Sequence, residues 1–593
     1  MTMPADTKGF AAAMDAAAIP EPGPTPGGYP AWPNLAAMMF SRALAWRDRP
    51  ALWAKAGASW RATTWLSLGA QAAGLAATLR QRGVSPGDRV LLLAENRPEW
   101  PIADTAIMAI RGISVPAYTT YTPGDLAHVL KDSGARAAIV STRALAAKLG
   151  AAAAEAGGLD LVVAMEEPAP IAGATTLGWD EAVAAALLPG FRDEVLAIPG
   201  EQTACLIYTS GTGGAPKGVM LPHRALLSNC AGAWALLSPL DLRDETYLSF
   251  LPLSHSYEHT CGQFFLLSIG TQVFYASGAD KVAQEMAEVR PTVMTVVPRL
   301  FEVIRSRILA QLKRAPKWKR DLFVAALALG ARRARGEPLG FLGSLADPVL
   351  DFIVRRKVRA RFGGRLKGIM SGGARLDPDV GGFFLALGIP VMQGYGQTEA
   401  GPVISANPPG RIRIDTVGLP LPNVAVRIAE DGEILVRGDL VMQGYWNNPE
   451  ATAAVLRDGW LHTGDVGALD ADGYLRITDR KREIIKTTGG DMISPARVEG
   501  VLAQQAAIAQ AVVAGDGRAH LVALLVPAEG ADERALSRAV EEANRALTVT
   551  ERVRRWRAVP AFTIENGLLT STQKVRRQKV LAEHRALVEE MYA

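Results

Sequence analysis

The chain has 593 residues, of which 49% are hydrophobic, and a formal net charge of +5. A chain of this length can bury a large core divided among more than one domain. Its three cysteines, Cys205, Cys230 and Cys261, show neither metal-site spacing nor a disulfide framework, which favours a reducing compartment. No apolar run approaches the ~20 residues that a membrane-spanning helix needs, and the first residues lack a secretory signal pattern. We therefore expect a cytoplasmic protein.

Residues 1–34 are rich in Ala, Pro and Gly, and we expect a poorly ordered leader or a tail that wraps the first domain. From residue 35 onward, predicted helices alternate with short apolar strands. Such alternation predicts an α/β fold with largely parallel sheets, whose ligands bind beyond the carboxyl ends of the strands. After residue 480 the pattern predicts a small α+β domain. The predicted helices include 64–81, 123–132 and 532–547, and the predicted strands include 89–94, 137–140, 159–165, 203–207, 271–275, 292–297 and 366–370.

The positive charge is concentrated in one predicted helical segment, residues 301–367. From residue 302 to 367 there are 17 Lys or Arg and 5 Asp or Glu, whereas the rest of the chain has 47 basic and 54 acidic residues. This basic insertion is either a solvated helical element or a patch that contacts an anionic membrane surface, where each nearby basic residue contributes ~1 kcal/mol. No recognised nucleic-acid motif accompanies the charge, so we expect no nucleic-acid partner.

The predicted strand 203–207 leads into Y-T-S-G-T-G-G-A-P-K-G-V-M at 208–220. Glycines let backbone N–H groups face an anion, while hydroxyls and the lysine add donors and charge. The P-loop motif is excluded, because Pro216 precedes Lys217 and Gly218 follows it. We interpret the segment as a polyphosphate-binding loop. Its candidate binding residues are Thr209, Ser210, Gly211, Thr212, Gly213, Gly214 and Lys217.

This loop resembles the signature T-S-G-T-T-G-x-P-K-G of the adenylate-forming (AMP-binding) superfamily, which includes acyl-CoA synthetases, peptide-synthetase adenylation domains and luciferases. Gly213 stands where that family usually has a second threonine, so weakened or rearranged phosphate contacts are expected. The resemblance runs from about residue 35 to the end. It implies a large AMP-binding domain over 35–478, a hinge over 479–482 and a mobile lid domain over 483–593.

Two later motifs, S-G-G-A at 371–374 and Q-G-Y-G-Q-T-E at 393–399, resemble the family's nucleotide site. Mg²⁺ bound with a nucleotide is typically held by one or two carboxylates plus substrate oxygens, so Glu399 fits a metal ligand, with Thr209 as a second candidate. The resemblance implies that Thr398 contacts the α-phosphate, that Asp465 binds the ribose and that Arg480 lies nearby. The candidates from these motifs are Gly373, Ala374, Gln393, Gly394, Tyr395, Gly396, Thr398, Glu399, Asp465 and Arg480.

The stretch H-S-Y-E-H at 255–259 places two histidines four residues apart, but it differs from the metalloprotease H-E-x-x-H. By resemblance, His255 lies beside the acyl and nucleotide pocket; a histidine of the core is the alternative.

Near the end, G-L-L-T-S-T-Q-K-V-R-R at 567–577 resembles the family's catalytic-lysine motif, with Lys574 as the lysine. Ser571 replaces the usual proline, and Gln573 replaces a glycine or leucine. These departures loosen the loop without removing the lysine. The resemblance further implies that Arg482 is the hinge pivot and that Lys486, Gly489 and Gly490 line a tunnel for CoA.

Together these motifs imply a ligase that uses ATP, Mg²⁺ and CoA to convert a carboxylic acid into an acyl-adenylate and then a thioester. The helical insertion resembles the long-chain fatty acyl branch, which favours a fatty acid substrate. Its basic charge would allow peripheral contact with the inner membrane surface. The alternatives are loading of a separate carrier protein, a medium-chain or aryl acid substrate, and a non-enzymatic lipid- or membrane-binding scaffold.

Overall fold

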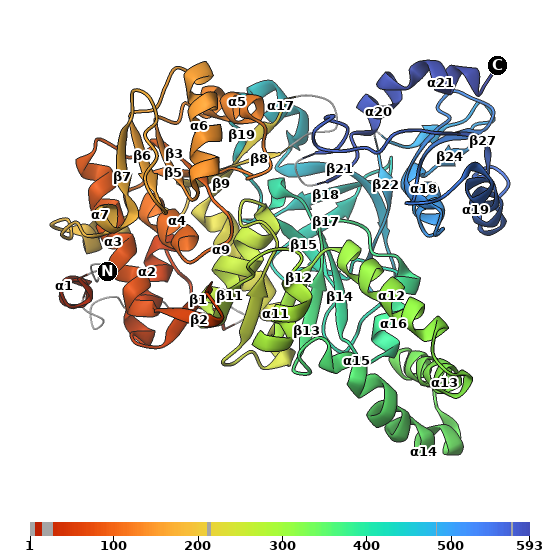
Figure 1. Ribbon diagram of the computed structural model, residues 1–593. Coiled ribbons are helices and arrows are strands. Elements are labelled where there is room, and N and C mark those ends of the chain that lie inside the picture. The colour runs from red at the N-terminus through yellow and green to blue at the C-terminus, as the bar shows by residue number, and fades with distance from the viewer. Residues whose placement is uncertain (1–5, 15–27, 210–214, 482, 571–572) are drawn as a thin grey trace.

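The computed structural model describes residues 6–14, 28–209, 215–481, 483–570 and 573–593. A large N-terminal domain, red to light blue in Figure 1, carries three sheets, and a small C-terminal domain, in darker blue, carries two. The fold is α/β with a smaller α+β domain, so the predicted fold class is confirmed.

The first sheet has eight strands and is parallel from β8 to β7, with an antiparallel edge at β9 and β19. Its order is β19 (Gly444–Tyr445), β9 (Lys217–Pro222), β8 (Thr203–Thr209), β4 (Ile113–Pro116), β3 (Arg89–Leu93), β5 (Ala137–Val140), β6 (Leu161–Ala164) and β7 (Thr175–Gly178).

The second sheet has nine strands and is parallel from β14 to β1, with antiparallel strands at both ends. Its order is β16 (Leu419–Pro420), β15 (Val403–Ala406), β14 (Val391–Gly396), β13 (Gly368–Ser371), β12 (Val293–Val296), β10 (Thr246–Ser249), β11 (Gln272–Tyr275), β1 (Pro50–Ala56) and β2 (Ser59–Thr64).

A third, antiparallel sheet follows the second along the chain. It consists of β17 (Ala425–Ile428), β18 (Glu433–Arg437), β21 (Trp460–Leu469), β20 (Leu456–Arg457) and β22 (Leu475–Arg480). The C-terminal domain contains the pair β23 (Ile485–Lys486) and β24 (Met492–Ile493) and the sheet β25 (Ile508–Ala514), β26 (Leu521–Pro527) and β27 (Val553–Ala558).

Helices cover these sheets and fill the space between them. In the first half of the large domain they are α1 (Thr7–Met14), α2 (Leu35–Trp46), α3 (Trp65–Gln81), α4 (Glu99–Ala109), α5 (Pro123–Ser133), α6 (Arg143–Ala156), α7 (Trp179–Val183), α8 (Phe191–Leu196), α9 (His223–Leu237), η2 (Ser238–Leu240), η3 (Glu258–Phe265), α10 (Leu266–Ser268) and α11 (Val282–Val289). Further along are α12 (Pro298–Lys313), α13 (Lys317–Ala334), α14 (Gly340–Leu350), η4 (Asp351–Arg355), α15 (Arg356–Ala360), α16 (Pro378–Ala386), η5 (Thr398–Ala400) and α17 (Pro449–Val455), and in the small domain α18 (Pro495–Ala503), α19 (Glu533–Ala546), α20 (Arg577–Glu583) and α21 (Arg585–Glu590).

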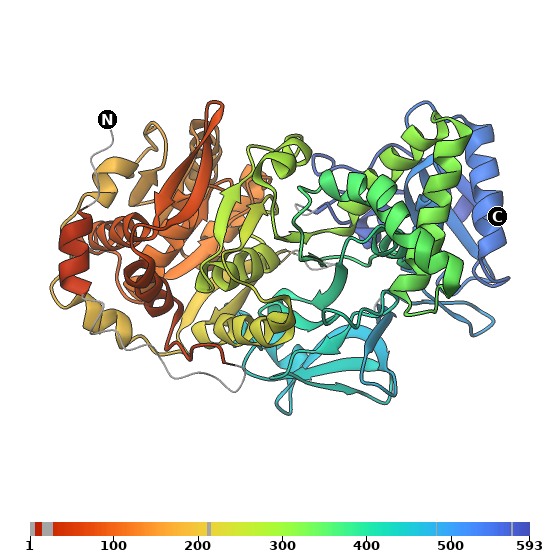
Figure 2. The same ribbon diagram turned by 90° about the horizontal axis from the view of Figure 1, so that it is seen from below.

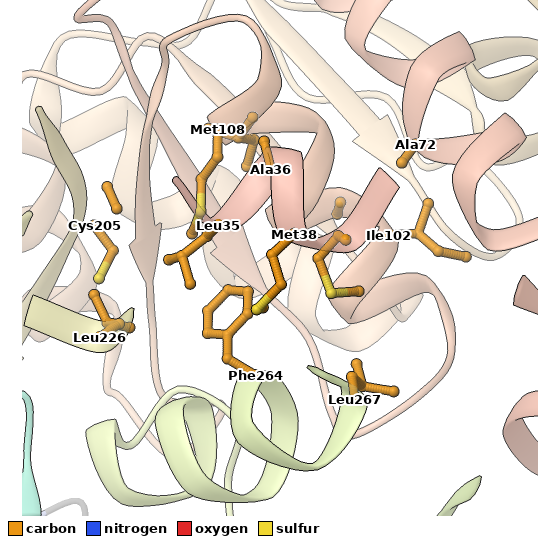
Figure 3. Close-up of a cluster of buried hydrophobic side chains, with 14 of the residues drawn as sticks. Leu35, Ala36, Met38, Ala72, Ile102, Met108, Cys205, Leu226, Phe264 and Leu267 are labelled. Carbon is orange, nitrogen blue, oxygen red and sulfur yellow. The ribbon is translucent and has the colours of Figure 1, made fainter. Parts of the chain in front are cut away.

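The largest apolar core lies where α2, α3 and α4 meet the strand β8 and the helices α9, η3 and α10. Figure 3 shows Leu35 and Met38 of α2 near Phe264 of η3, with Cys205 of β8 alongside. The start of α2 is fixed by Asn34, whose side chain accepts from the Ala37 N–H and donates to two distant carbonyls. Capping of this kind satisfies N–H groups that the first helical turn leaves unpaired.

The expectation of a poorly ordered leader over residues 1–34 is wrong for the described parts of that segment. Residues 7–14 form α1, and its Phe10 and Met14 are buried, with the Phe10 ring 5.8 Å from that of Phe40. Tyr29 and Trp32 are buried as well. A few large apolar side chains among Ala, Pro and Gly therefore suffice to hold these residues against the first domain, as the alternative of a wrapping tail anticipates.

The basic insertion is helical, as predicted, and consists of α12, α13, α14, η4 and α15. In Figure 1, α13 and α14 project from the lower right of the molecule, away from the C-terminal domain at the upper right; Figure 2 shows the same helices from below. Within the described ranges, no helix is both long and apolar enough to cross a membrane.

Candidate functional site

A cavity of about 1440 Å³ is lined by residues of both domains. The strands β8, β13 and β14 end at it, β21 and β22 form one wall, and the C-terminal domain contributes Thr570, Lys574, Val575 and Arg576. The cavity brings together these sequence-predicted candidates: Thr209, Lys217, His255, Gly373, Ala374, Gln393, Gly394, Tyr395, Gly396, Thr398, Glu399, Asp465, Arg480 and Lys574.

The predicted polyphosphate loop connects β8 to β9. Thr209 and Lys217 face each other across the antiparallel pair at its two ends. Ser210, Gly211, Thr212, Gly213 and Gly214 lie outside the described residues. The Lys217 ammonium sits 4.8 Å from the centroid of the Tyr445 ring, a cation–π arrangement that orients the charge beside the cavity.

Glu399 belongs to the short helix η5, which follows β14. Its Oε1 accepts a hydrogen bond of 2.9 Å from the Tyr445 hydroxyl, and the preceding residue, Thr398, is bonded to Ser256 at 2.9 Å. Sequence reasoning missed Tyr445 and Ser256, since neither carries a charge and both are ordinary packing residues in most settings.

Glu399 and Thr209 both line the cavity, and a carboxylate with a hydroxyl suits Mg²⁺ that keeps nucleotide oxygens as its other ligands. In the described part of the chain, no group of three or more His, Cys, Asp or Glu residues is arranged to hold a metal ion by itself. The donor set of Glu399 and Thr209 therefore fits a metal that is bound together with a nucleotide.

Asp465 lies on β21 with two partners from different elements. The Tyr395 hydroxyl donates to Oδ2 at 2.6 Å, and Arg480 Nε lies 3.4 Å from Oδ1. Burial raises the pKa of Asp465, whereas Arg480 and the Tyr395 hydrogen bond act in the opposite direction. Oδ1 lies beside a guanidinium that is itself half exposed, so this oxygen can also accept a hydrogen bond from a ligand such as a sugar hydroxyl.

Gly373 has φ of +78°, a backbone conformation that favours glycine, in the turn after β13. Several buried polar atoms of the cavity wall have no hydrogen-bond partner among the described residues, which is unusual for a protein interior. They are Ser371 Oγ, Gln393 Oε1, Gln397 Nε2 and Asp479 Oδ2. A polar ligand in the cavity would supply these missing partners.

His255 and His259 do not form a metal pair. His255 lines the cavity, where its Nδ1 accepts from the Tyr257 N–H at 3.1 Å. His259 is fully buried and pairs with Asp104 at 2.8 Å. Burial, with a smaller contribution from the nearby Lys574 ammonium, lowers the pKa of His255 to about 4, so this imidazole is neutral near pH 7.

Lys574 is held by a turn whose backbone is fixed at both ends. Thr570 N–H donates to the Lys574 carbonyl at 2.8 Å, and Lys574 N–H donates to Thr570 Oγ1 at 3.0 Å. Lys574 keeps part of its surface exposed, but partial desolvation of its ammonium among the cavity walls and then Arg480 lower its pKa, whereas the carboxylates of Asp465 and Glu399 raise it. The lysine of the small domain therefore lies within electrostatic reach of both acids of the large domain.

Three sequence-predicted residues are not in the cavity. Lys486, Gly489 and Gly490 lie in and beside the β23–β24 hairpin, where they are exposed. Arg482, the predicted pivot, lies outside the described residues.

Part of the cavity lining is apolar, which sequence reasoning did not locate, and we call this part the apolar arm. Its walls come from α9, η2, η3, β12, β13 and β14, and its lining includes Leu237, Leu240, Phe265, Val293, Gly368 and Met392. These residues have the same composition as the core, so nothing in the sequence separates them from it. A cavity whose lining is apolar in one part and polar and charged in another suits a ligand with an apolar tail and an anionic head.

Two family models match the chain. The model described as AMP-binding enzyme matches residues 39–446, and the model described as AMP-binding enzyme C-terminal domain matches residues 482–593. The chain therefore belongs to the AMP-binding enzyme family, which confirms the resemblance to adenylate-forming enzymes.

Among curated relatives, the long-chain-fatty-acid–CoA ligase FadD15 of Mycobacterium tuberculosis is 35% identical over 540 residues, covering 86% of this chain and 89% of that protein. Long chain acyl-CoA synthetase 1 of Arabidopsis thaliana is 29% identical, covering 87% and 86%. Among solved structures, o-succinylbenzoate CoA synthetase of Bacillus subtilis, in complex with ATP and magnesium ion, superposes with a TM-score of 0.67 at 22% identity, covering 91% of this chain and 98% of that one. The last likeness shows the fold alone.

Proposed function

We propose that this protein is an ATP-dependent ligase that activates a fatty acid as an acyl-adenylate and transfers the acyl group to CoA. The observation that carries the proposal is the shared cavity, into which Lys574 of the small domain reaches beside Glu399 and Asp465 of the large one. This lid position suits the first half-reaction, in which the lysine is needed.

In that half-reaction a carboxylate oxygen attacks the α-phosphorus of ATP, the bond to the β-phosphate breaks, and pyrophosphate leaves. Lys574 places a positive charge between the two anionic reactants and offsets the charge that develops on the α-phosphate. Thr398 and the β8–β9 loop with Lys217 hold the phosphates, and Asp465 with Arg480 holds the ribose. Mg²⁺, held by Glu399 and Thr209, supplies further charge neutralisation when bound.

In the second half-reaction the CoA sulfur attacks the acyl carbon, the thiol proton is lost, and AMP leaves. The exposed position of Gly489 and Gly490 supports a lid that turns between the two steps, since a tunnel lined by these residues needs them at the cavity. Motion about residues 479–482 would withdraw Lys574 and bring Gly489 and Gly490 to the cavity, a common form of gating.

A long acyl chain fits the apolar arm better than a short or aromatic acid. The lining of the arm includes Leu237, Leu240 and Gly368. Burial of each methylene contributes about 0.8 kcal/mol, so a longer acyl chain gains more binding free energy from this apolar lining. The relatives named as long-chain ligases support the same choice.

We also propose that the protein works at an anionic membrane surface, which the basic insertion contacts. The segment from 302 to 367 has 17 basic and 5 acidic residues, and it stands out from the large domain. Each basic residue near an anionic surface contributes ~1 kcal/mol. This contact would bring the enzyme to membrane-dissolved fatty acids.

Pyrophosphate release tests the ligase directly. With ATP, Mg²⁺ and CoA, release is expected to rise from acetate to long-chain acids, and each turnover should yield one acyl-CoA. Release that depends on a carrier protein in place of CoA would refute CoA as the acceptor, and the absence of release with every acid would refute the ligase.

A further inference from the structure

An apolar surface faces solvent on the basic insertion. Residues 340–360 form one continuous helical run through α14, η4 and α15. Phe341, Leu345, Val349 and Phe352 recur at spacings of four, four and three residues, so they share one face of the run. Phe341 and its neighbour Leu342 are each 80% exposed, Phe352 is 65% exposed, and Leu345 and Val349 are more than half exposed. We call these five residues the apolar ridge.

The opposite face of the same run holds charged side chains inside the protein. Arg355 is fully buried, and its guanidinium pairs with Asp347 at 2.6 Å and donates to the Ala326 carbonyl of α13 at 3.0 Å. A helix on a solvated surface normally buries its apolar face and exposes its charges. Leu350 and Val358 of the same run are buried in this way, whereas the five ridge side chains are left in solvent. A contiguous exposed apolar surface of this kind marks a site of contact with a partner or a membrane.

Basic residues flank the ridge. The Arg356 guanidinium lies 5.4 Å from the centroid of the Phe352 ring, and Lys357 beside it is exposed. At the N-terminal end of α13, Trp318 is 59% exposed, and the Lys319 ammonium lies 5.3 Å from the centroid of its ring. Aromatic and aliphatic side chains edged by Lys and Arg are the composition of surfaces that lie in a membrane interface.

We propose that the apolar ridge inserts into the headgroup and upper acyl region of an anionic bilayer while the flanking arginines and lysines contact lipid phosphates. The inference rests on the proposed membrane contact and names the surface and mode of that contact. A second copy of the chain is a poorer occupant, because two insertions with the same strong positive charge repel each other at contact distance.

The position of the ridge leaves the enzyme free to work. Helix α14 packs on α13, which packs on α16 of the large domain. Figure 1 places α14 at the outer edge of the molecule, away from the C-terminal domain, so a bilayer at the ridge does not obstruct the lid.

Co-sedimentation of the full-length protein with phosphatidylcholine vesicles, with and without phosphatidylglycerol, tests the proposal. The variant Phe341→Ser/Leu345→Ser/Phe352→Ser removes three ridge side chains. Since each apolar side chain that leaves water contributes roughly tenfold to partitioning, this variant is expected to bind anionic vesicles roughly 100-fold or more weakly. Val549→Ser, at an exposed valine outside the insertion, is the matched control and is expected to bind like the wild type.

Salt separates insertion from adhesion by charge. High salt screens the ionic contribution but leaves apolar insertion in place. The wild type is therefore expected to keep part of its binding at high salt, and Arg356→Gln/Lys357→Gln should bind more weakly mainly at low salt. The ridge variant should lose what remains at high salt.

Three results would overturn the ridge proposal. They are vesicle binding by the ridge variant equal to that of the wild type, no vesicle binding by the wild type, and a wild-type dimer that the ridge variant converts to monomers. Pyrophosphate release with a short, water-soluble fatty acid should be equal in all variants. If the wild type releases no pyrophosphate, the ligase proposal is refuted and the ridge proposal is not. The failure of one proposal is therefore distinguishable from the failure of the other.

Discussion

The turn that carries Lys574 contains Gln573 at φ of +61°, in the left-handed region that favours glycine. Gln573, which replaces the family's usual glycine or leucine, therefore occupies a position whose left-handed backbone favours glycine. Gln573→Val is expected to add roughly 1–2 kcal/mol of strain to the turn and to slow adenylate formation by about tenfold. Gln573→Gly should not slow it, since the glycine relieves the strain. ATP–pyrophosphate exchange measures both, and a glycine variant slower than the valine variant would contradict this reading of the turn.

Glu258 is a fully buried acid at the start of η3. Its carboxylate accepts from the hydroxyls of Tyr247, Ser249 and Thr295, yet burial raises its pKa from 4.5 to about 7. The folded protein thus keeps a proton that the unfolded chain releases near pH 4.5. This proton adds on the order of 3 kcal/mol to the free energy of unfolding. The contribution is fully present below pH 4.5 and is lost as the pH rises through about 7.

Glu258→Gln is therefore expected to flatten the fall in unfolding free energy between pH 5 and 8. Urea denaturation at several pH values in that range measures the free energy of unfolding, and Glu450→Gln, at an exposed glutamate, is the control. An unchanged slope in Glu258→Gln would show that this carboxyl is ionised in the folded protein throughout the range.

The residues that the sequence identified are those whose chemistry is unusual for their position. Glycines, hydroxyls and a lysine after an apolar strand predict an anion site, and the carboxylate of Glu399 predicts a ligand for a cation. Tyr445 and Leu240 line the same cavity, but their residue types are those of a protein core. Whether such a side chain packs in the core or lines a cavity depends on the tertiary fold, which the local sequence does not show.

At the scale of elements, short apolar runs predicted the strands well. The expected strand at 137–140 is β5 with the same bounds, and the expected helix at 64–81 is α3, which begins one residue later. The parallel order of the strands and the meeting of β8, β13 and β14 at one cavity depend on long-range pairing, which no local pattern encodes. The exposed face of α14 was missed because its apolar spacing equals that of a buried helix.

Strand β13 supplies a wall of the apolar arm at Gly368, where an added Cβ would lie 2.6 Å from Met392 Cε and 3.2 Å from Leu240 Cδ1. Gly368→Leu would fill this part of the arm. Since one methylene of pocket space discriminates by roughly tenfold or more, kcat/KM for long-chain acids is expected to fall at least that much relative to a short acid. A uniform fall across chain lengths would place the acyl chain elsewhere.

At the scale of the whole molecule, the two domains are joined by a hydrogen bond of 2.6 Å from Gln504, at the end of α18, to Asp377, which caps α16. A reducible thiol crosslinker between Asp377→Cys and Gln504→Cys would hold the lid in its present position. Adenylate formation is expected to continue, whereas acyl-CoA formation should stop until reductant is added, because the lid cannot turn. Each single-cysteine variant serves as a control, and normal acyl-CoA output from the crosslinked enzyme would rule out the proposed lid rotation.

The central claim is that one lysine from the small domain completes a nucleotide site built by the large one. Lys574→Ala tests it most directly when the two half-reactions are measured separately. We expect ATP–pyrophosphate exchange to fall by roughly 10²–10³-fold, the usual effect of removing a preorganised charge, while CoA thioester formation from synthetic acyl-adenylate stays near the wild-type rate. Equal loss in both half-reactions would contradict the claim.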